Sequence, residues 1–351
     1  MKSAPISRSL ARAFSLIELL VVIAIIALVV SLVIPAVGSA RRSARDADTR
    51  SLCASLEQAC HQYVLDNRRN PGYFSAREMG GGENATLGFS AMQNVMLDLA
   101  GGIVASSAPG VNVGPSATGT VRVSPELIGS ASNGNKAYFS PKGKYFQLQD
   151  GTNQDGGTRA SNAENARIPE VVDAEGTPIL IWTVDESCNK AIATAADYPV
   201  NMARQDSSTG ISRFYWVSNA AFLGESGGNA PQVGKRRIAQ ANANDARGFS
   251  LIGAGVSSPD IRARNLAAIL SSPNSPVPFA ANATADQILP SAPRGQFIIH
   301  AAGRDGIYLN RNDRGGKSLG NAGGLLHYGS NFKPAAEDIL RSWDDIVISG
   351  N

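Results

Sequence analysis

One acidic side chain stands at the start of a long apolar run near the N-terminus. Glu18 is followed by 22 residues, Leu19 to Ala40, without a charged side chain. As a helix these residues rise about 1.5 Å each and span roughly 33 Å, which is enough to cross a bilayer. A carboxylate inside a membrane helix costs on the order of 2.5 to 3.5 kcal/mol. Glu18 therefore either stays solvated near the headgroups or meets a positive charge within an assembly.

A second group of oxygen-bearing side chains lies near the C-terminus. The stretch 295–306 has the pattern of a strand that runs into a tight turn, and the chain closes on the stretch 343–348. A hard cation such as calcium binds about six to eight oxygens from carboxylates, amides and backbone carbonyls. The residues with this chemistry are Asp305, Asn310, Asp313, Asp344 and Asp345. Their chemistry suits such a cation; the alternative is a Gly306 turn with two surface aspartates at the end of a strand.

Basic residues in the intervening segment oppose a cation. The insert 311–341 carries Arg311, Arg314, Lys317, His327 and Lys333. Positive charge close to the loop weakens its attraction for a cation. The sequence alone leaves open whether the insert preserves the site.

Catalytic and nucleic-acid patterns are absent from the sequence. None of the three histidines, His61, His300 and His327, lies in a metal-ligand or nucleophile motif. The sequence holds no phosphate-binding glycine loop, and no cluster of Lys and Arg on an ordered element predicts a nucleic-acid partner. We therefore expect a protein that is not an enzyme and requires no cofactor.

The charges around the apolar run set its orientation. Lys2, Arg8 and Arg12 are the charges that precede Glu18, so the positive-inside rule predicts a cytoplasmic N-terminus and sends the chain after Ala40 outward. A secretory signal cleaved after Ala40 is the alternative. It fits less well, because an apolar core of roughly 20 residues exceeds the usual length of about 7 to 15.

The apolar helix is expected to continue beyond the membrane. Leu52, Leu56, Ala59 and Tyr63 repeat at helical spacing, and an Asn-Pro-Gly stop follows at 70–72. The pattern predicts one helix from about 14 to 65 whose second half packs against the rest of the chain.

The remaining chain predicts short helices and strands separated by polar loops. We expect helices at 89–99 and 258–270, strands at 138–148, 179–182, 214–217 and 295–302, and a loop at 106–120. Cys53 and Cys60 lie two helical turns apart, too far to bridge each other, so any disulfide would use Cys188. Three free thiols are the alternative. The fold class predicted is α+β, with a long helix on a small antiparallel sheet and large loop insertions.

The N-terminal residues resemble the signature of type IV pilins and type II secretion pseudopilins. A short basic leader ends at Ala13, Phe14-Ser15-Leu16-Ile17-Glu18 follows, and Pro35 lies near the end of the apolar run. The resemblance implies that a prepilin peptidase cuts between Ala13 and Phe14 and N-methylates Phe14. It also implies that Glu18 pairs with the α-amino group of a neighbouring subunit and that Pro35 bends the helix. The residue before the cut is usually glycine in this family; Ala13 is small enough to replace it.

Two later elements are similar to those of major pseudopilins. The stretch from Asp173 to Trp182 resembles a turn and the following strand in major pseudopilins, with Glu175 where that family usually has tryptophan. The Asp305-Gly306 turn and the terminal Asp344-Asp345-Ile346 resemble its calcium-binding loop. The implied organisation is a leader at 1–13, a membrane and filament-core helix at 14–40, its amphipathic continuation at 41–70, and an extracytoplasmic head at 71–351.

Three functions are compatible with these patterns. The first is a subunit of a type II secretion pseudopilus, and the second is a type IV pilin for adhesion, motility or DNA uptake. The third is a membrane-anchored enzyme or binding protein that does not assemble. For the first two, the implied partners are other pilin-like subunits, the prepilin peptidase, an inner-membrane assembly platform and membrane lipid. The implied location is the bacterial inner membrane, crossed once, with the head in the periplasm.

Overall fold

The architecture was analysed in a computed structural model of the chain. It describes residues 16–79, 89–131, 136–148, 164–184, 250–252, 269–270, 272, 293–310, 313, 340 and 343–350. The chain divides into two compact units, residues 1–45 and residues 46–351. The second unit is called the head below.

The N-terminal helix is continuous, as predicted. Helix α1 spans Leu16–Asn67, 52 residues, with Pro35 inside it. Pro35 lacks the N–H that an inner helical position would donate, yet helical geometry continues on both sides of it. The helix ends where Arg68 takes a left-handed backbone conformation, φ 55°, just before Pro71 and Gly72.

Within the first unit, α1 exposes its apolar side chains. Leu16 is 80% exposed and Ile34 is 67% exposed, and the residues between them are exposed too. This segment is long and apolar enough to cross a membrane. Its surface is therefore one that lipid or another protein must cover.

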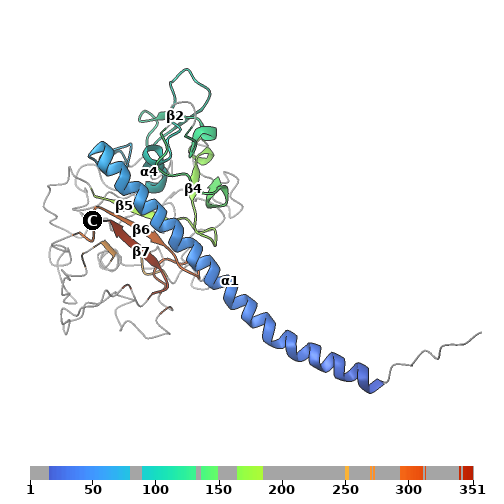
Figure 1. Cartoon of the computed structure of the whole chain (residues 1–351). Helices are drawn as coiled ribbons and strands as arrows, with labels where there is room; N and C mark the ends of the chain where they lie inside the picture. Colours follow the sequence, from blue (N-terminus) through green and yellow to red (C-terminus); the bar gives the residue numbers. More distant parts are fainter. Residues whose placement is uncertain are drawn as a thin grey trace, which may run out of the picture. The chain divides into compact units, whose positions relative to one another are not determined.

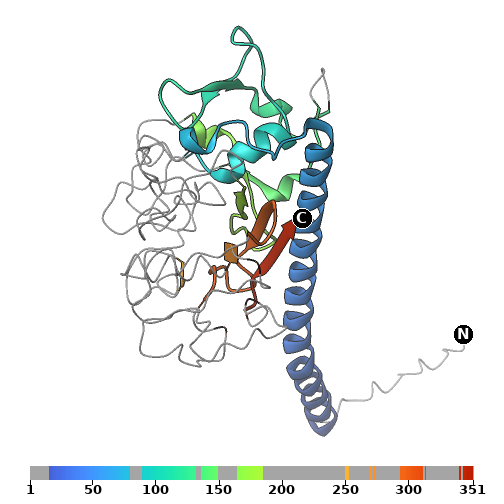
Figure 2. The same cartoon turned by 90° about the vertical axis from the view of Figure 1, so that its left-hand side faces the viewer.

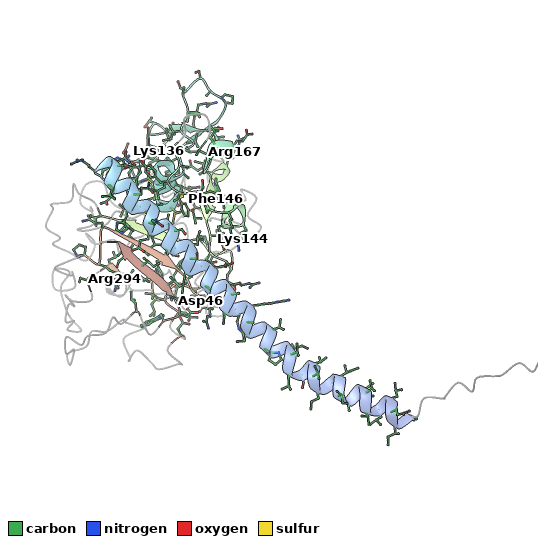
Figure 3. All side chains as sticks on the ribbon, in the orientation of Figure 1. Asp46, Lys136, Lys144, Phe146, Arg167 and Arg294 are labelled. Atoms are coloured by element: carbon green, nitrogen blue, oxygen red, sulfur yellow. The ribbon has the colours of Figure 1, made fainter. Side chains whose placement is uncertain are left out.

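Within the head, α1 buries one face. The predicted stripe of Leu52, Leu56, Ala59 and Tyr63 is buried in the core, which confirms the predicted periodicity. Cys53 and Cys60 are buried beside it as free thiols, whereas Cys188 lies outside the described residues. Ion pairs tie the same helix to the head at its surface, Lys144 to Asp48 at 2.8 Å and Lys136 to Asp66 at 2.7 Å (Figure 3).

Two short helices follow among the described residues of the head. Helix α2 is Ala76–Met79, and helix α4 is Ala91–Leu99, close to the predicted 89–99. A capping box starts α4: the Ser90 hydroxyl accepts from the Gln93 N–H, and the Gln93 side chain accepts from the Ser90 N–H. The helix is nearly all buried, so it is part of the core.

In the part of the chain that the structure describes, the strands form three small antiparallel sheets. Strand β1, Val111–Val113, pairs with β2, Val121–Val123, and β3, Phe146–Leu148, pairs with β4, Pro169–Val171. The third sheet has the order β5-β6-β7, with β5 at Leu180–Thr183, β6 at Phe297–Ala301 and β7 at Ile346–Gly350. Single 3₁₀ turns lie at Pro125–Leu127, Gly143–Tyr145 and Asn165–Arg167.

The β5-β6-β7 sheet covers the second half of α1 with one face. Phe297, Ile299, Ala301 and Ile346 share one core with the buried stripe of α1, and Figures 1 and 2 show β6 and β7 beside that helix. Side chains alternate along a strand, so His300 lies on the opposite face. The α+β class and the packing of a long helix on a small antiparallel sheet are thereby confirmed.

The head differs from the prediction in several described places. Of the stretch 138–148, only 146–148 is a strand, after a 3₁₀ turn at 143–145, and strand β4 at Pro169–Val171 was not predicted. The stretch 106–120 contains strand β1 and is not all loop, because Val111 and Val113 bury against the core across the hairpin from Val121 and Val123. Short alternation between glycines and serines is a weak signal, and burial decided the outcome. The predicted strand at 214–217 and most of the predicted helix at 258–270 lie outside the described residues.

Candidate functional site

The residues predicted to direct processing and assembly lie at the start of α1. Ala13 and Phe14 are outside the described residues. Glu18 is exposed in the first turn of α1, on the same segment as the exposed apolar side chains. A carboxylate near a helix N-terminus is favourably placed, because the helix dipole is positive there.

The predicted calcium ligands come together at one end of the β5-β6-β7 sheet. One carboxylate oxygen from each of Asp305, Asp313 and Asp344 lies within 4.8 Å of the others. Asp305 is in the turn after β6, and Asp344 precedes β7, which is the antiparallel neighbour of β6. Strand pairing therefore brings together residues that are far apart in the sequence.

Backbone groups fix two of these carboxylates. Asp344 Oδ2 accepts from the Arg304 N–H at 2.8 Å, and Asp305 Oδ1 accepts from the Ile307 N–H at 2.8 Å. Gly303 has φ 73°, and a Cβ at this position would clash with the Asp344 carboxylate. The turn is thus shaped to admit a carboxylate, which only glycine permits here.

Several carboxylate oxygens in this cluster are buried and have no hydrogen-bond partner. They are Asp313 Oδ2, Asp344 Oδ1 and Asp345 Oδ2. Buried polar atoms are normally satisfied, and an ionised oxygen without a partner is expensive. An arrangement that fixes one oxygen and leaves the other open has the chemistry of a cation site.

The pKa values in the cluster follow from burial and mutual repulsion. Burial, with repulsion from Asp344, Asp305 and Asp345, raises the pKa of Asp313 to about 8. Burial and the charges of Asp305 and Asp345 raise the pKa of Asp344 to about 6, and burial raises that of Asp305. With these raised pKa values the cluster holds protons near neutral pH, and a bound cation would displace them.

The other two predicted ligands take supporting positions. Asn310 donates its side-chain amide to Asp305 Oδ2 at 2.5 Å. Asp345 lies beside His300, with 2.5 Å between Oδ1 and Nε2, and the same oxygen accepts from the Leu309 N–H at 2.9 Å. Neither belongs to the group of three whose ligand atoms converge.

Some residues of the site were not predicted. Gly303 and Arg304 shape the turn, and His300 was considered only as a catalytic candidate. The Arg304 guanidinium does not oppose a cation here, because it turns to Asp46 of α1, 3.3 Å away (Figure 3 labels Asp46). The basic residues of 311–341 that were expected to oppose a cation lie outside the described residues.

The turn at Asp173 matches its prediction. Asp173 Oδ1 accepts from the N–H groups of Glu175 and Thr177 at 2.9 and 2.8 Å, and Gly176 has φ 82°. This is an Asx-type turn closed by a glycine in the left-handed region. The turn leads into β5, and the Ala174 N–H donates to Thr49 of α1 at 3.2 Å.

Comparison with known proteins identifies the N-terminal segment. Residues 8–34 match the family model described as the prokaryotic N-terminal methylation motif. This prepilin-type motif is typical of type IV pilins and pseudopilins and implies a substrate of prepilin peptidase. No curated protein and no solved structure matches the chain. The match ends before Pro35, so it concerns the apolar helix and not the head.

Proposed function

We propose that this protein is a filament subunit that assembles from the inner membrane through its N-terminal helix. The observation that carries the proposal is the junction of a prepilin-type motif at 8–34 with the first unit's exposed apolar helix. Such a surface is stable in lipid before assembly and against other apolar helices afterwards. A structural subunit is preferred to an enzyme, because every feature of this segment serves insertion and packing.

The proposed mechanism of assembly depends on Glu18. Cleavage between Ala13 and Phe14 creates a positive α-amino group four residues from this carboxylate. In a nearly dry core of packed helices, a charge pair between subunits is much stronger than in water. An unpaired charge there is costly, so the pair favours addition of a subunit in the correct register.

This function implies a membrane topology and a set of partners for the protein. The leader is cytoplasmic, where the peptidase cuts it, the helix crosses the inner membrane once, and the head is periplasmic. The partners are further copies, other pilin-like subunits and the inner-membrane assembly platform.

The mature N-terminus tests this function most directly. Mass spectrometry of protein from native membranes is expected to give N-methylated Phe14 as the first residue. A start at Arg41 would mean release by signal peptidase, and an intact Met1 would mean a simple anchor. Either of these results would remove the assembly mechanism.

Within this class we favour a secretion pseudopilus over a type IV pilus. The support is the Asp173 turn into β5 and the acidic cluster where β6 and β7 meet, both similar to elements of major pseudopilins. Deletion of the gene is expected to abolish export of secreted enzymes and to leave surface pili intact. Loss of pili with normal export would reverse the assignment.

We further propose that Asp305, Asp313 and Asp344 hold a calcium ion. The support is the convergence of their oxygens and the buried, partnerless oxygens of Asp313, Asp344 and Asp345. Calorimetry on the full-length protein in detergent is expected to detect one calcium ion per chain, and Asp344→Asn is expected to abolish the heat. The matched control is the exposed Glu126→Gln, which leaves binding unchanged. Absence of heat at millimolar calcium would remove the site.

A further inference from the structure

His300 is the one histidine of the described residues that is fully buried. It lies on the central strand β6, pairs with Leu180 of β5 and Val347 of β7, and its side chain has no exposed surface. Trp182 stacks on its ring at 5.7 Å, and Tyr308 meets it edge-on at 5.2 Å. Two aromatic rings therefore fix the orientation of the imidazole.

The imidazole ends on Asp345. Its Nε2 lies 2.5 Å from Asp345 Oδ1. The same oxygen accepts from the Leu309 N–H, and an ionised carboxylate only accepts, so the bond is made by the imidazole tautomer that carries its proton on Nε2. The second oxygen of Asp345, Oδ2, is buried and has no hydrogen-bond partner.

The Leu309 N–H, which bonds Asp345, belongs to the 305–310 turn. Leu309 has φ 46°, an uncommon backbone conformation for a leucine, and the bond to Asp345 helps to hold it. The neighbouring Asn310 bonds Asp305, one of the three converging carboxylates. Hydrogen bonds thus link His300 to Asp345 and Asp345 to Leu309, and the next residue, Asn310, bonds Asp305 in the turn.

The adjacent residues Asp344 and Asp345 have different hydrogen-bond partners. It follows Asp344 directly, and alternation near the start of β7 directs the two side chains to opposite sides. Asp344 meets the Arg304 N–H, and Asp345 meets His300 on the face of the sheet away from α1. Asp345 is therefore outside the converging group, and it contacts the 305–310 turn through the Leu309 N–H.

We propose that His300 is a positioning residue of the calcium site: it holds Asp345 so that the bond from the Leu309 N–H to this carboxylate fixes the 305–310 turn that presents Asp305. The inference rests on the calcium site proposed above and adds to it a histidine that touches no ligand of the converging group. Partners that orient metal-site groups in this way typically change affinity by about 10- to 100-fold when they are lost.

Two substitutions separate positioning from packing. His300→Phe keeps an aromatic ring between Trp182 and Tyr308 but removes the donor, whereas His300→Gln keeps a side-chain N–H that reaches Asp345. Calcium affinity of the full-length protein in detergent is measured by calorimetry. We expect affinity to fall about 10-fold or more in His300→Phe and to stay within about threefold of the parent in His300→Gln.

Terbium, a luminescent substitute for calcium, supplies a readout that packing alone does not change. Its emission lifetimes in H₂O and D₂O count the water molecules bound to the ion. We expect at least one additional water in His300→Phe, because Asp345 no longer holds the turn that presents Asp305, and the parent value in His300→Gln.

The outcomes distinguish the two proposals. Calcium binding by the parent with unchanged affinity and hydration in His300→Phe would overturn the positioning role alone. Equal losses in His300→Phe and His300→Gln would also overturn it, because the donor would not be the cause. No binding by the parent would overturn the calcium site and this inference together.

Discussion

The two halves of α1 differ in what covers their apolar side chains. Both are rich in apolar side chains, but the stripe around Leu56 is buried in the protein's own core, whereas Ile26 and the apolar residues around it are exposed. The second half buries its apolar surface in the core and so stabilises the head. The first half keeps its apolar surface exposed, and Glu18 is the one carboxylate within it.

The largest expected effect concerns that carboxylate. Glu18→Ala is expected to leave the protein in the membrane and to abolish filaments, because the new α-amino group of an added subunit would find no counter-charge in the apolar core. Electron microscopy of sheared filaments measures assembly, and membrane fractionation measures insertion.

Glu57→Ala is the matched control, since this glutamate lies on the same helix in the head and pairs only loosely with His61 at 3.9 Å. Filaments are expected to persist in this variant. Normal filaments from Glu18→Ala would contradict the proposed mechanism and erase the functional difference between the halves.

A pair of leucines tests the difference in folding. Leu56 is fully buried and Leu28 is 65% exposed. Leu56→Ala is expected to lower the free energy of unfolding of the head by about 2 to 5 kcal/mol, because it leaves a cavity in the core. Leu28→Ala is expected to leave this free energy unchanged. Urea titration of the full chain in detergent, followed by tryptophan fluorescence, gives both values; equal effects would show that the halves do not differ in this way.

A smaller effect is expected from pH, and it concerns the head alone. Burial and repulsion raise the pKa of Asp313 to about 8 and that of Asp344 to about 6, against an ordinary value of 3.8. The folded state therefore binds more protons than the unfolded state between about pH 4 and pH 8, and without calcium the stability of the head falls as pH rises through this window.

Melting temperatures in a chelator at pH 5 and pH 8 measure this effect. Calcium is expected to restore stability at pH 8, where it replaces the protons. The double variant Asp313→Asn and Asp344→Asn is expected to flatten the pH dependence. A head that becomes more stable from pH 5 to pH 8 in the chelator would contradict the raised pKa values.

The sequence predicted what periodicity and local signals control. The continuous helix, the stripe of Leu52 to Tyr63 and the α4 segment follow from spacing at 3.6 residues per turn and from the stop at 70–72. The short strand β1 was missed, because three residues carry almost no periodic signal and tertiary burial decides their conformation.

The site was predicted in composition but not in arrangement. Acidic residues beside a glycine turn identified the residues, whereas the pairing of β6 with β7 decides which three converge and sends Asp345 toward His300. Strand register and the face on which a side chain lies depend on residues far apart in the chain. No local pattern around His300 carries that information.

The smallest expected effect is an absence of reaction at the two cysteines of α1. Burial raises the pKa of Cys53 to about 12 and raises that of Cys60 as well, so almost no thiolate is present at neutral pH. Neither thiol is expected to react with an aromatic disulfide reagent in the native protein, and both react after unfolding.

A cysteine introduced at the exposed Ala54, next to Cys53 on the helix, provides the contrast. Ala54→Cys is expected to add one fast-reacting thiol to the native protein. Fast native labelling of Cys53 or Cys60 would mean that the head opens readily around α1. In that case the second half of the helix would expose its apolar face much as the first half does, and the contrast between intramolecular burial and association would weaken.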